Sequence, residues 1–372
     1  MHFLLIPFAA LSAMFVVHYH QQDRRTANAG LVVTAGITMV LLSAAILFRP
    51  VAGDGWRYHQ YYLWVRQVDF VSMLQDERTD FLYKLLNWGI GQAGDSALWL
   101  FGASLVLFMA TFIWALRRLL PPAQAAAVFM CYAAYPFFIA YGANGLRQGL
   151  ALVCMLMALV QFNRGRTRSG WLWLLPIPFW HGGSLIGALV VAVFVLMNRW
   201  VPRERWRWNL VLAAFFFSIL LSLTGLNAAI LGQLPDVFDI EARHQVYFMD
   251  PSQVGVAYRT GFRPDFALFS LLPLISAVLL RRMGPMFSFK ASGWWLAIYL
   301  SLNCLYHLFS FAPFADRFSS FSWFLLPLVL FLQVRDTGNR WLRSLFIVGI
   351  ASVNLLMLQF YTGNFLPPPV WW

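Results

Sequence analysis

The chain has 372 residues, of which 60% are hydrophobic and only 11% charged, whereas soluble domains carry about a quarter charged residues. This composition excludes a water-soluble surface and indicates a polytopic membrane protein. The formal charge of +12 does not indicate nucleic-acid binding. The arginines fall in short loops between apolar runs, where lipid headgroups and topology determinants are found.

Apolar runs long enough to cross a hydrocarbon core of roughly 30 Å recur along the whole chain. We therefore expect one all-α membrane domain, residues 1–372, with about twelve transmembrane helices. The expected spans are 3–18, 29–48, 96–116, 123–143, 148–162, 171–180, 184–197, 209–226, 266–280, 293–311, 319–334 and 344–361. The first is interpreted as a short helix, because it lacks the basic start and the cleavage site of a signal peptide.

Two features of this topology are a pair of short spans and an uneven distribution of basic residues. The spans 171–180 and 184–197 are short, so they could instead form one re-entrant hairpin. Most of the 27 basic residues fall in loops on one side, so the positive-inside rule places that side in the cytoplasm and both termini outside. Two long external loops, 49–95 and 227–265, are expected to carry short amphipathic helices. They hold almost all external acids, so chemistry is expected at the outer face of a bacterial cytoplasmic membrane.

Several cofactor classes are disfavoured by the motifs. The chain has neither a GxxxxGK[ST] loop nor a GxGxxG turn between a strand and a helix, which argues against a nucleotide site. The cysteines Cys131, Cys154 and Cys304 all lie in apolar segments, which argues against structural disulfides and a zinc site.

The first external loop combines carboxylates with aromatic residues. Asp54 and Tyr58 share one face if the segment is helical, and Asp80 with Tyr83 repeats the pattern. A carboxylate beside aromatic rings suits sugars, whose hydroxyls bind carboxylates and whose C–H faces stack on rings, so we assign these residues to a substrate site. The alternative is an interfacial helix that uses its aromatic residues as headgroup anchors.

Asn144, Arg147 and Gln148 follow helical i, i+3, i+4 spacing at the external edge of a span, so their side chains are expected to share a face. An arginine at this position usually has a counter-ion or a function, although it can also snorkel to the headgroups. His181 lies between two apolar spans. There it suits proton transfer or phosphate binding, but a lone histidine can equally be structural.

Further charged residues lie on the same external side. Arg243 and His244 belong to the second long loop, and Asp316 with Arg317 forms an adjacent pair in a short external turn. Guanidinium groups bind phosphates bidentately and stay charged. Several arginines on this side therefore predict binding of a phosphate or diphosphate group.

The order and spacing of these motifs resemble the EpsG family of Wzy-like exopolysaccharide polymerases. The resemblance covers about residues 50–330 and rests on Asp54-x3-Tyr58, the stretch 80–83, the segment Asn144-Gly-Leu-Arg-Gln-Gly-Leu-Ala, Trp180-His-Gly-Gly-Ser-Leu and Asp316-Arg317. Family members usually have glutamate where this chain has Asp80 and a residue such as phenylalanine where it has Trp180.

The resemblance implies transfer of a polyprenyl-diphosphate-linked glycan onto a sugar hydroxyl of the next lipid-linked repeat unit at the outer leaflet. Arg147 and Arg317, with Arg243 as a third candidate, would bind the diphosphate. His181 or Asp54 would accept the proton of the hydroxyl. The reaction needs no cofactor, and no metal is required because the arginines neutralise the diphosphate.

The remaining assignments concern the substrate groove and the partners. Tyr58 and Tyr83 would line the glycan groove, and Asn144 with Gln148 would orient Arg147. A polysaccharide flippase and a chain-length or export complex would be partners, beside the bilayer. The alternatives are another lipid-linked glycosyltransferase or a glycan ligase, a lipid-linked oligosaccharide flippase, and a scaffold protein without chemistry.

Overall fold

The computed structural model describes residues 24–47, 54–133, 135–233, 260–283 and 291–336, with short stretches at 341–342, 345–350 and 352–353. Within these residues all regular structure is helical and no β-strand is present, which confirms the all-α prediction. The chain divides into two compact units. The first comprises Met1–Ser184 and Arg340–Trp372, and the second comprises Leu185–Asn339.

The first unit carries the helices of the N-terminal half. In chain order these are α2 (Arg24–Leu47), α3 (Asp54–Val65), α4 (Phe70–Gln75), α5 (Phe81–Ala93), α6 (Ala97–Leu119), α7 (Pro122–Ala133), α8 (Pro136–Ala143), α9 (Leu146–Asn163), α10 (Thr167–Leu174), α11 (Ile177–Trp180) and the 3-10 turn η1 (Gly182–Ser184).

Helix α9 is the core of this unit. It is apolar on all sides and almost entirely buried, as expected for a helix surrounded by other helices. It packs along α6, α10 and α11. Beside it, aromatic rings of α6, α7 and α8 interlock, with the ring of Phe112 4.7 Å from Phe138 and 5.8 Å from Phe129. A rigid centre of this kind fixes the position of side chains at the start of α9.

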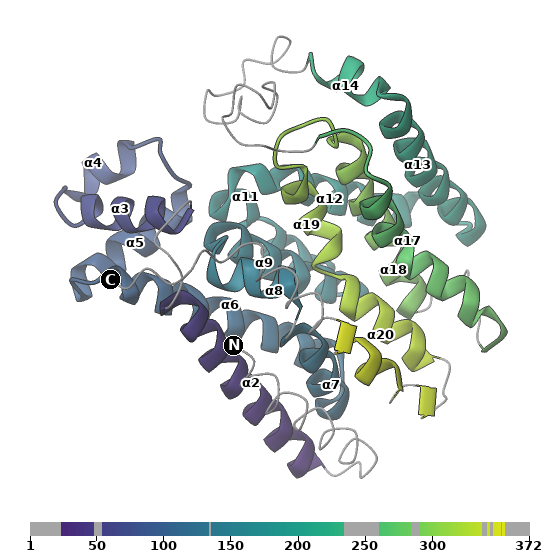
Figure 1. Cartoon of the computed structure of the whole chain (residues 1–372), viewed down its shortest axis with the longest axis horizontal. Coiled ribbons are helices and arrows are strands. Elements are labelled where there is room, and N and C mark those ends of the chain that lie inside the picture. Colours follow the sequence, from purple (N-terminus) through teal and green to yellow (C-terminus); the bar gives the residue numbers. More distant parts are fainter. Residues whose placement is uncertain are drawn as a thin grey trace. The chain divides into compact units, whose positions relative to one another are not determined.

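The stretch from 54 to 95 folds into three short helices, as expected, and Figure 1 shows α3, α4 and α5 grouped together. Asp69 caps α4 by accepting hydrogen bonds from the N–H groups of Val71 and Ser72. The hydroxyl of Tyr62 donates to the carbonyl of Gly94 at 2.7 Å, which ties α3 to the end of α5. These contacts make the segment an ordered platform rather than a loose loop.

The apolar run 123–143 is not one straight helix. It consists of α7 and α8, which are bent by 82° relative to each other, so it is a broken span or a re-entrant segment. Pro136 begins α8, where its missing N–H costs no helical hydrogen bond. Asn144 and Gly145 then separate α8 from α9. The expectation that Asn144 shares a helical face with Arg147 and Gln148 is therefore wrong, because Asn144 lies before the helix begins.

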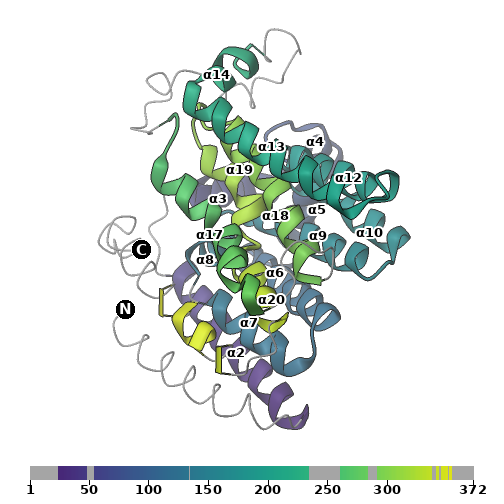
Figure 2. The ribbon, with the colours of Figure 1, turned by 90° about the vertical axis from the view of Figure 1, so that its right-hand side faces the viewer.

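The second unit contains α12 (Leu185–Trp200), α13 (Glu204–Thr224), α14 (Leu226–Leu231), α17 (Pro264–Leu280), η3 (Arg281–Met283), α18 (Ala291–Leu308), α19 (Ala315–Trp323) and α20 (Leu326–Asp336). Helix α13 runs along α18 (Figure 2). Inside the unit, Ser270 accepts hydrogen bonds from Asn303 at 3.1 Å and from the indole of Trp323 at 3.0 Å. These buried bonds join α17, α18 and α19.

Five helical segments in the described residues are long and apolar enough to cross a membrane, and the bent pair α7 and α8 would make a sixth. They are Ala97–Leu119, Leu146–Asn163, Gly182–Trp200, Glu204–Thr224 and Ala315–Asp336. A total of twelve stays a prediction, and the expected first span, 3–18, lies outside the described residues.

The region 171–197 differs in detail from its expected form. The first short span is interrupted, because α10 ends at Leu174 and α11 resumes only at Ile177, beyond Pro176. The second is longer than expected, because its helix continues to Trp200. The segment Gly182–Trp200 is therefore long enough to cross a membrane alone, whereas α10 and α11 are not.

Gly149 offers a test of the packing around the start of α9. A Cβ atom there would lie 2.3 Å from the carbonyl oxygen of Tyr141 in α8. We expect Gly149→Ala to lower the free energy of unfolding by roughly 1–3 kcal/mol, because the backbone of α8 would have to move. Gly102→Ala is the matched control, since a Cβ in that part of α6 meets nothing within 4 Å. Equal melting temperatures for both variants in detergent would contradict this packing.

Candidate active site

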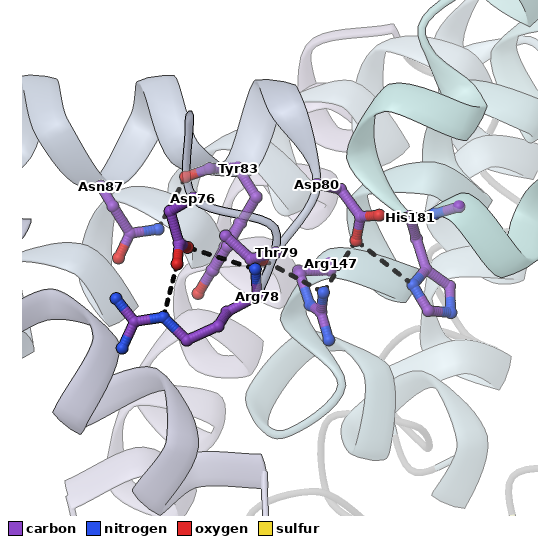
Figure 3. Close-up of polar contacts among 9 residues, drawn as sticks. Asp76, Arg78, Thr79, Asp80, Tyr83, Asn87, Arg147 and His181 are labelled. Atoms are coloured by element: carbon purple, nitrogen blue, oxygen red, sulfur yellow. Dashed lines mark hydrogen bonds and ion pairs between the residues drawn. The ribbon is translucent and has the colours of Figure 1, made fainter. Parts of the chain in front are cut away.

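Three residues that are far apart in the sequence meet in the first unit: Asp80, Arg147 and His181 (Figure 3). Asp80 precedes α5, Arg147 lies in the first turn of α9, and His181 follows α11. All three were predicted as site residues. The fold brings them together because α11 packs against both α5 and α9.

Asp80 is the centre of this group. Its Oδ2 accepts a hydrogen bond from Nη1 of Arg147 at 2.7 Å, and its Oδ1 accepts one from the backbone N–H of Gly182 at 3.0 Å. Nδ1 of His181 lies 3.7 Å from Oδ2. Asp80 occupies the N-cap position of α5, but its side chain does not cap that helix. The carboxylate instead joins the starts of α5 and α9 to the end of α11.

The environment of Asp80 keeps it ionised. Burial by itself would raise the pKa of this carboxyl, but the neighbouring imidazole of His181, the positive charge of Arg147 and the N–H of Gly182 together lower the pKa to about 2. A carboxylate with so low a pKa, and with both oxygens already accepting hydrogen bonds, is a poor general base. Its geometry suits the positioning of Arg147 and His181.

Arg147 is held by two partners and keeps donors for a third. Its Nη1 donates to Asp80 and, at 3.1 Å, to the hydroxyl of Thr79. Its Nε is buried and has no hydrogen-bond partner among the described residues. The side chain remains 25% exposed, against 5% for Asp80. Arg147 can therefore offer N–H groups to an anion that approaches from outside, while Asp80 stays behind it.

His181 presents its ring between Asp80 and a glycine turn. Nδ1 faces the carboxylate, and a Cβ atom on Gly183 would lie 3.2 Å from Nε2. Glycine at 183 thus leaves room beside the second ring nitrogen. A carboxylate near Nδ1 favours a proton on that nitrogen and leaves Nε2 able to accept one. Such an imidazole can serve as a general base.

Two tyrosines predicted to line a glycan groove lie in the interior instead. Tyr83 is fully buried and Tyr58 is 7% exposed, with their ring centres 5.4 Å apart. The guanidinium carbon of Arg147 lies 5.8 Å from the ring centre of Tyr58. In this structure the two rings therefore support Arg147 rather than form a surface that a glycan can reach.

Other aromatic side chains beside the site are exposed. Phe81 follows Asp80 directly, Phe179 precedes His181 by two residues, and each is nearly half exposed. Their ring centres lie 6.3 Å apart in an edge-to-face arrangement. Neither phenylalanine is predicted by the sequence patterns, and nor are Thr79 and the N–H of Gly182. The only available signal was their position beside predicted residues.

The remaining predicted residues of the first unit lie around this group. Asp54 is the first residue of α3, one turn before Tyr58. Asn144 is exposed between α8 and α9, whereas Gln148 is buried in α9. The guanidinium of Arg147 donates its hydrogen bonds to Thr79 and Asp80. Orientation of Arg147 by Asn144 and Gln148 therefore stays a prediction.

The other predicted residues belong to the second unit or lie outside the described residues. Asp316 and Arg317 form the first turn of α19. They follow Phe314, which has a φ of 60°, the only positive φ of a non-glycine residue in the part of the chain that the structure describes. Backbone strain of this kind clusters at functional sites. Arg243 and His244 lie outside the described residues.

A comparison with models of protein families gives one match, the EpsG family, over residues 3–367. The match spans nearly the whole chain. The chain belongs to the EpsG family. The resemblance seen in its motifs is thus confirmed. Neither the curated proteins nor the solved structures gave a match.

For an EpsG family member the implied activity, at the level of the family, is that of a Wzy-like polysaccharide polymerase in a membrane. Among the described residues, no group of three or more His, Cys, Asp or Glu side chains is arranged to hold a metal ion. The site of this EpsG protein brings together a carboxylate, a guanidinium and an imidazole.

The depressed pKa of Asp80 predicts a pH-dependent contribution to stability. The contribution is complete above the ordinary carboxyl pKa of 3.8 and is lost as the pH falls through about 2. At pH 7 the difference between the ordinary and the lowered pKa corresponds to about 2 kcal/mol in the free energy of unfolding. We expect Asp80→Asn to lower the melting temperature at pH 7, and the gap from wild type to narrow at pH 3.

The control for this measurement is Asp95→Asn, which removes an exposed carboxylate from the same segment, 54–95. Thermal unfolding of the purified protein in detergent measures all three proteins. A melting temperature for Asp80→Asn equal to that of wild type at pH 7 would contradict the role of the carboxylate as a structural link.

Proposed function

We propose that this EpsG protein transfers a polyprenyl-diphosphate-linked glycan onto a sugar hydroxyl of the next lipid-linked repeat unit, at the outer face of a bacterial cytoplasmic membrane. The observation that carries the proposal is the arrangement of Arg147 and His181 on one buried carboxylate, Asp80. It supplies an anion-binding group and a proton acceptor side by side, which are the two groups that this transfer requires.

In the proposed step, the acceptor oxygen attacks the anomeric carbon of the donor glycan. The new C–O bond forms as the bond from that carbon to the diphosphate oxygen breaks, and the hydroxyl proton moves to Nε2 of His181. The polyprenyl diphosphate leaves with the bonding electrons, and Arg147 stabilises its charge by hydrogen bonds. The leaving group supplies the driving force, so no nucleotide is consumed.

The proposal revises some roles expected from the sequence. Asp80 becomes a positioning residue for Arg147 and His181 rather than a substrate ligand. We prefer His181 to Asp54 as the base, because its contact with Asp80 places it beside Arg147. Arg317 remains a second candidate for the diphosphate, supported by the strained residue Phe314 just before it. Arg243, His244 and Asp316 remain substrate-binding predictions.

Localisation and partners belong to the same proposal. The excess of basic residues in the short loops supports an orientation with both termini outside. Arg147 begins a helix long enough to span a membrane, so the site would lie near the external surface. A flippase that delivers the lipid-linked units, and a complex that controls chain length and export, would act with the protein.

The direct test measures polymer length in cells that lack the protein and carry a variant. We expect His181→Gln to slow polymerisation by roughly 10²–10⁴-fold, the range for loss of a general base. Arg147→Lys should also slow polymerisation strongly, because a lysine keeps the charge but not the planar array of donors. Arg57→Gln is the control, since Arg57 is exposed on α3.

The leaflet in which lipid-linked single repeat units accumulate separates the alternatives. Accumulation at the outer leaflet, with no long polymer, supports a polymerase. Accumulation at the inner leaflet would indicate a flippase instead. Normal polymer length in both site variants, at wild-type membrane abundance, would contradict the assignment of the active site.

We further expect Phe81 and Phe179 to contact a sugar ring of the substrate, because exposed aromatic faces beside a polar site suit sugar C–H groups. Phe81→Ala with Phe179→Ala should raise KM at least several-fold and change kcat less. Phe70→Ala, in the exposed part of α4, is a matched control. A loss confined to kcat would argue against a role in substrate binding.

A further inference from the structure

Five arginines lie near the ends of three helices of the first unit, with Arg164 at the opposite end of α9 from Arg147. Arg117 and Arg118 lie in the last turn of α6, Arg164 follows α9, and Arg166 and Arg168 lie at the start of α10. All five side chains are exposed. We call this group the basic cluster.

Direct contacts hold the basic cluster together. The guanidinium of Arg164 donates a hydrogen bond to the carbonyl oxygen of Arg118, which joins the ends of α6 and α9. Trp114 of α6 and Trp173 of α10 pack edge to face with ring centres 5.4 Å apart. The guanidinium of Arg118 lies 5.7 Å from the ring centre of Trp114. The three helix ends therefore form one surface of fixed shape.

The basic cluster has no internal counter-charge. The described carboxylates of this unit all lie within 54–95, where Asp76 pairs with Arg78 and Asp80 pairs with Arg147 of α9. None of the five arginines forms an ion pair with a carboxylate of the described residues. Like charges held this close attract anions from the surroundings.

Apolar surface beside the charges narrows the choice of anion. Trp114 is 44% exposed and Leu172 of α10 is 70% exposed. Helix α6 is an apolar segment long enough to span a membrane, so its last turn lies at the depth of the lipid headgroups. A soluble polyanion would neutralise the arginines but leave these apolar side chains uncovered. An amphiphile with a phosphate headgroup and acyl chains would cover both.

We propose that the basic cluster is a binding site for an anionic phospholipid with two phosphate groups, of the cardiolipin type. The two phosphates would accept hydrogen bonds from the exposed guanidinium groups, which bind phosphate bidentately. The acyl chains would lie against Trp114 and Leu172. Basic pockets between transmembrane helices on the cytoplasmic side are suited to such lipids. The proposal does not depend on the enzymatic reaction.

The test is native mass spectrometry of the full-length protein in detergent, titrated with cardiolipin, phosphatidylglycerol or phosphatidylethanolamine. We expect cardiolipin to bind tightest. Arg117→Gln with Arg168→Gln should weaken its binding by roughly thirtyfold, from the contribution of a basic residue near a lipid phosphate. Arg203→Gln with Arg205→Gln removes the same charge from an exposed part of the second unit and should leave the affinity within about twofold.

A second variant separates a lipid from a soluble anion. Trp114→Ala should weaken cardiolipin binding while leaving any binding of inorganic pyrophosphate unchanged. Equal losses in the two arginine double variants would overturn the proposal in favour of general charge attraction. So would equal binding of cardiolipin and phosphatidylethanolamine, or displacement of cardiolipin by pyrophosphate at equal concentration.

Discussion

The candidate site depends on the interactions of the Asp80 carboxylate. It lies almost wholly inside the first unit, and a buried charge is stable only when paired and hydrogen-bonded. Its partners come from α9, through Arg147, and from the turn after α11, through Gly182 and His181. Satisfying this one charge thus fixes the guanidinium and the imidazole next to each other.

The interruptions of the helices serve the same arrangement. The chain breaks at Asn144, just before the helix that carries Arg147, and at His181, where His181 and the N–H of Gly182 lie beside Asp80. Breaks in membrane helices are tolerated where other protein groups bind the freed backbone atoms. Here Asp80 accepts a hydrogen bond from the backbone N–H of Gly182 at such a break. The site is thus supported by the rigid core around α9 without being buried in it.

Sequence patterns predicted much of this, but not its spatial detail. Hydropathy indicates helices because burial in lipid demands long apolar runs, and polar residues at the edges of such runs marked Arg147 and His181 as candidates. The pattern could not show that Asp80 links them, because Asp80 precedes Arg147 by 67 residues and Gly182, whose N–H it also binds, by 102 residues. The pattern also put Asn144 on one helical face with Arg147, although the helix begins only at Leu146. It further predicted that Tyr58 and Tyr83 line a glycan groove, although both rings are buried.

The most direct test of the account is glycan transfer by the purified protein in proteoliposomes that contain only a polyprenyl-diphosphate-linked repeat unit. The measured quantities are polymer length and released polyprenyl diphosphate, without added nucleotide. We expect one released carrier for each new linkage, and loss of both products when His181 is replaced by glutamine. A requirement for nucleotide, or full activity of the His181→Gln protein, would contradict it.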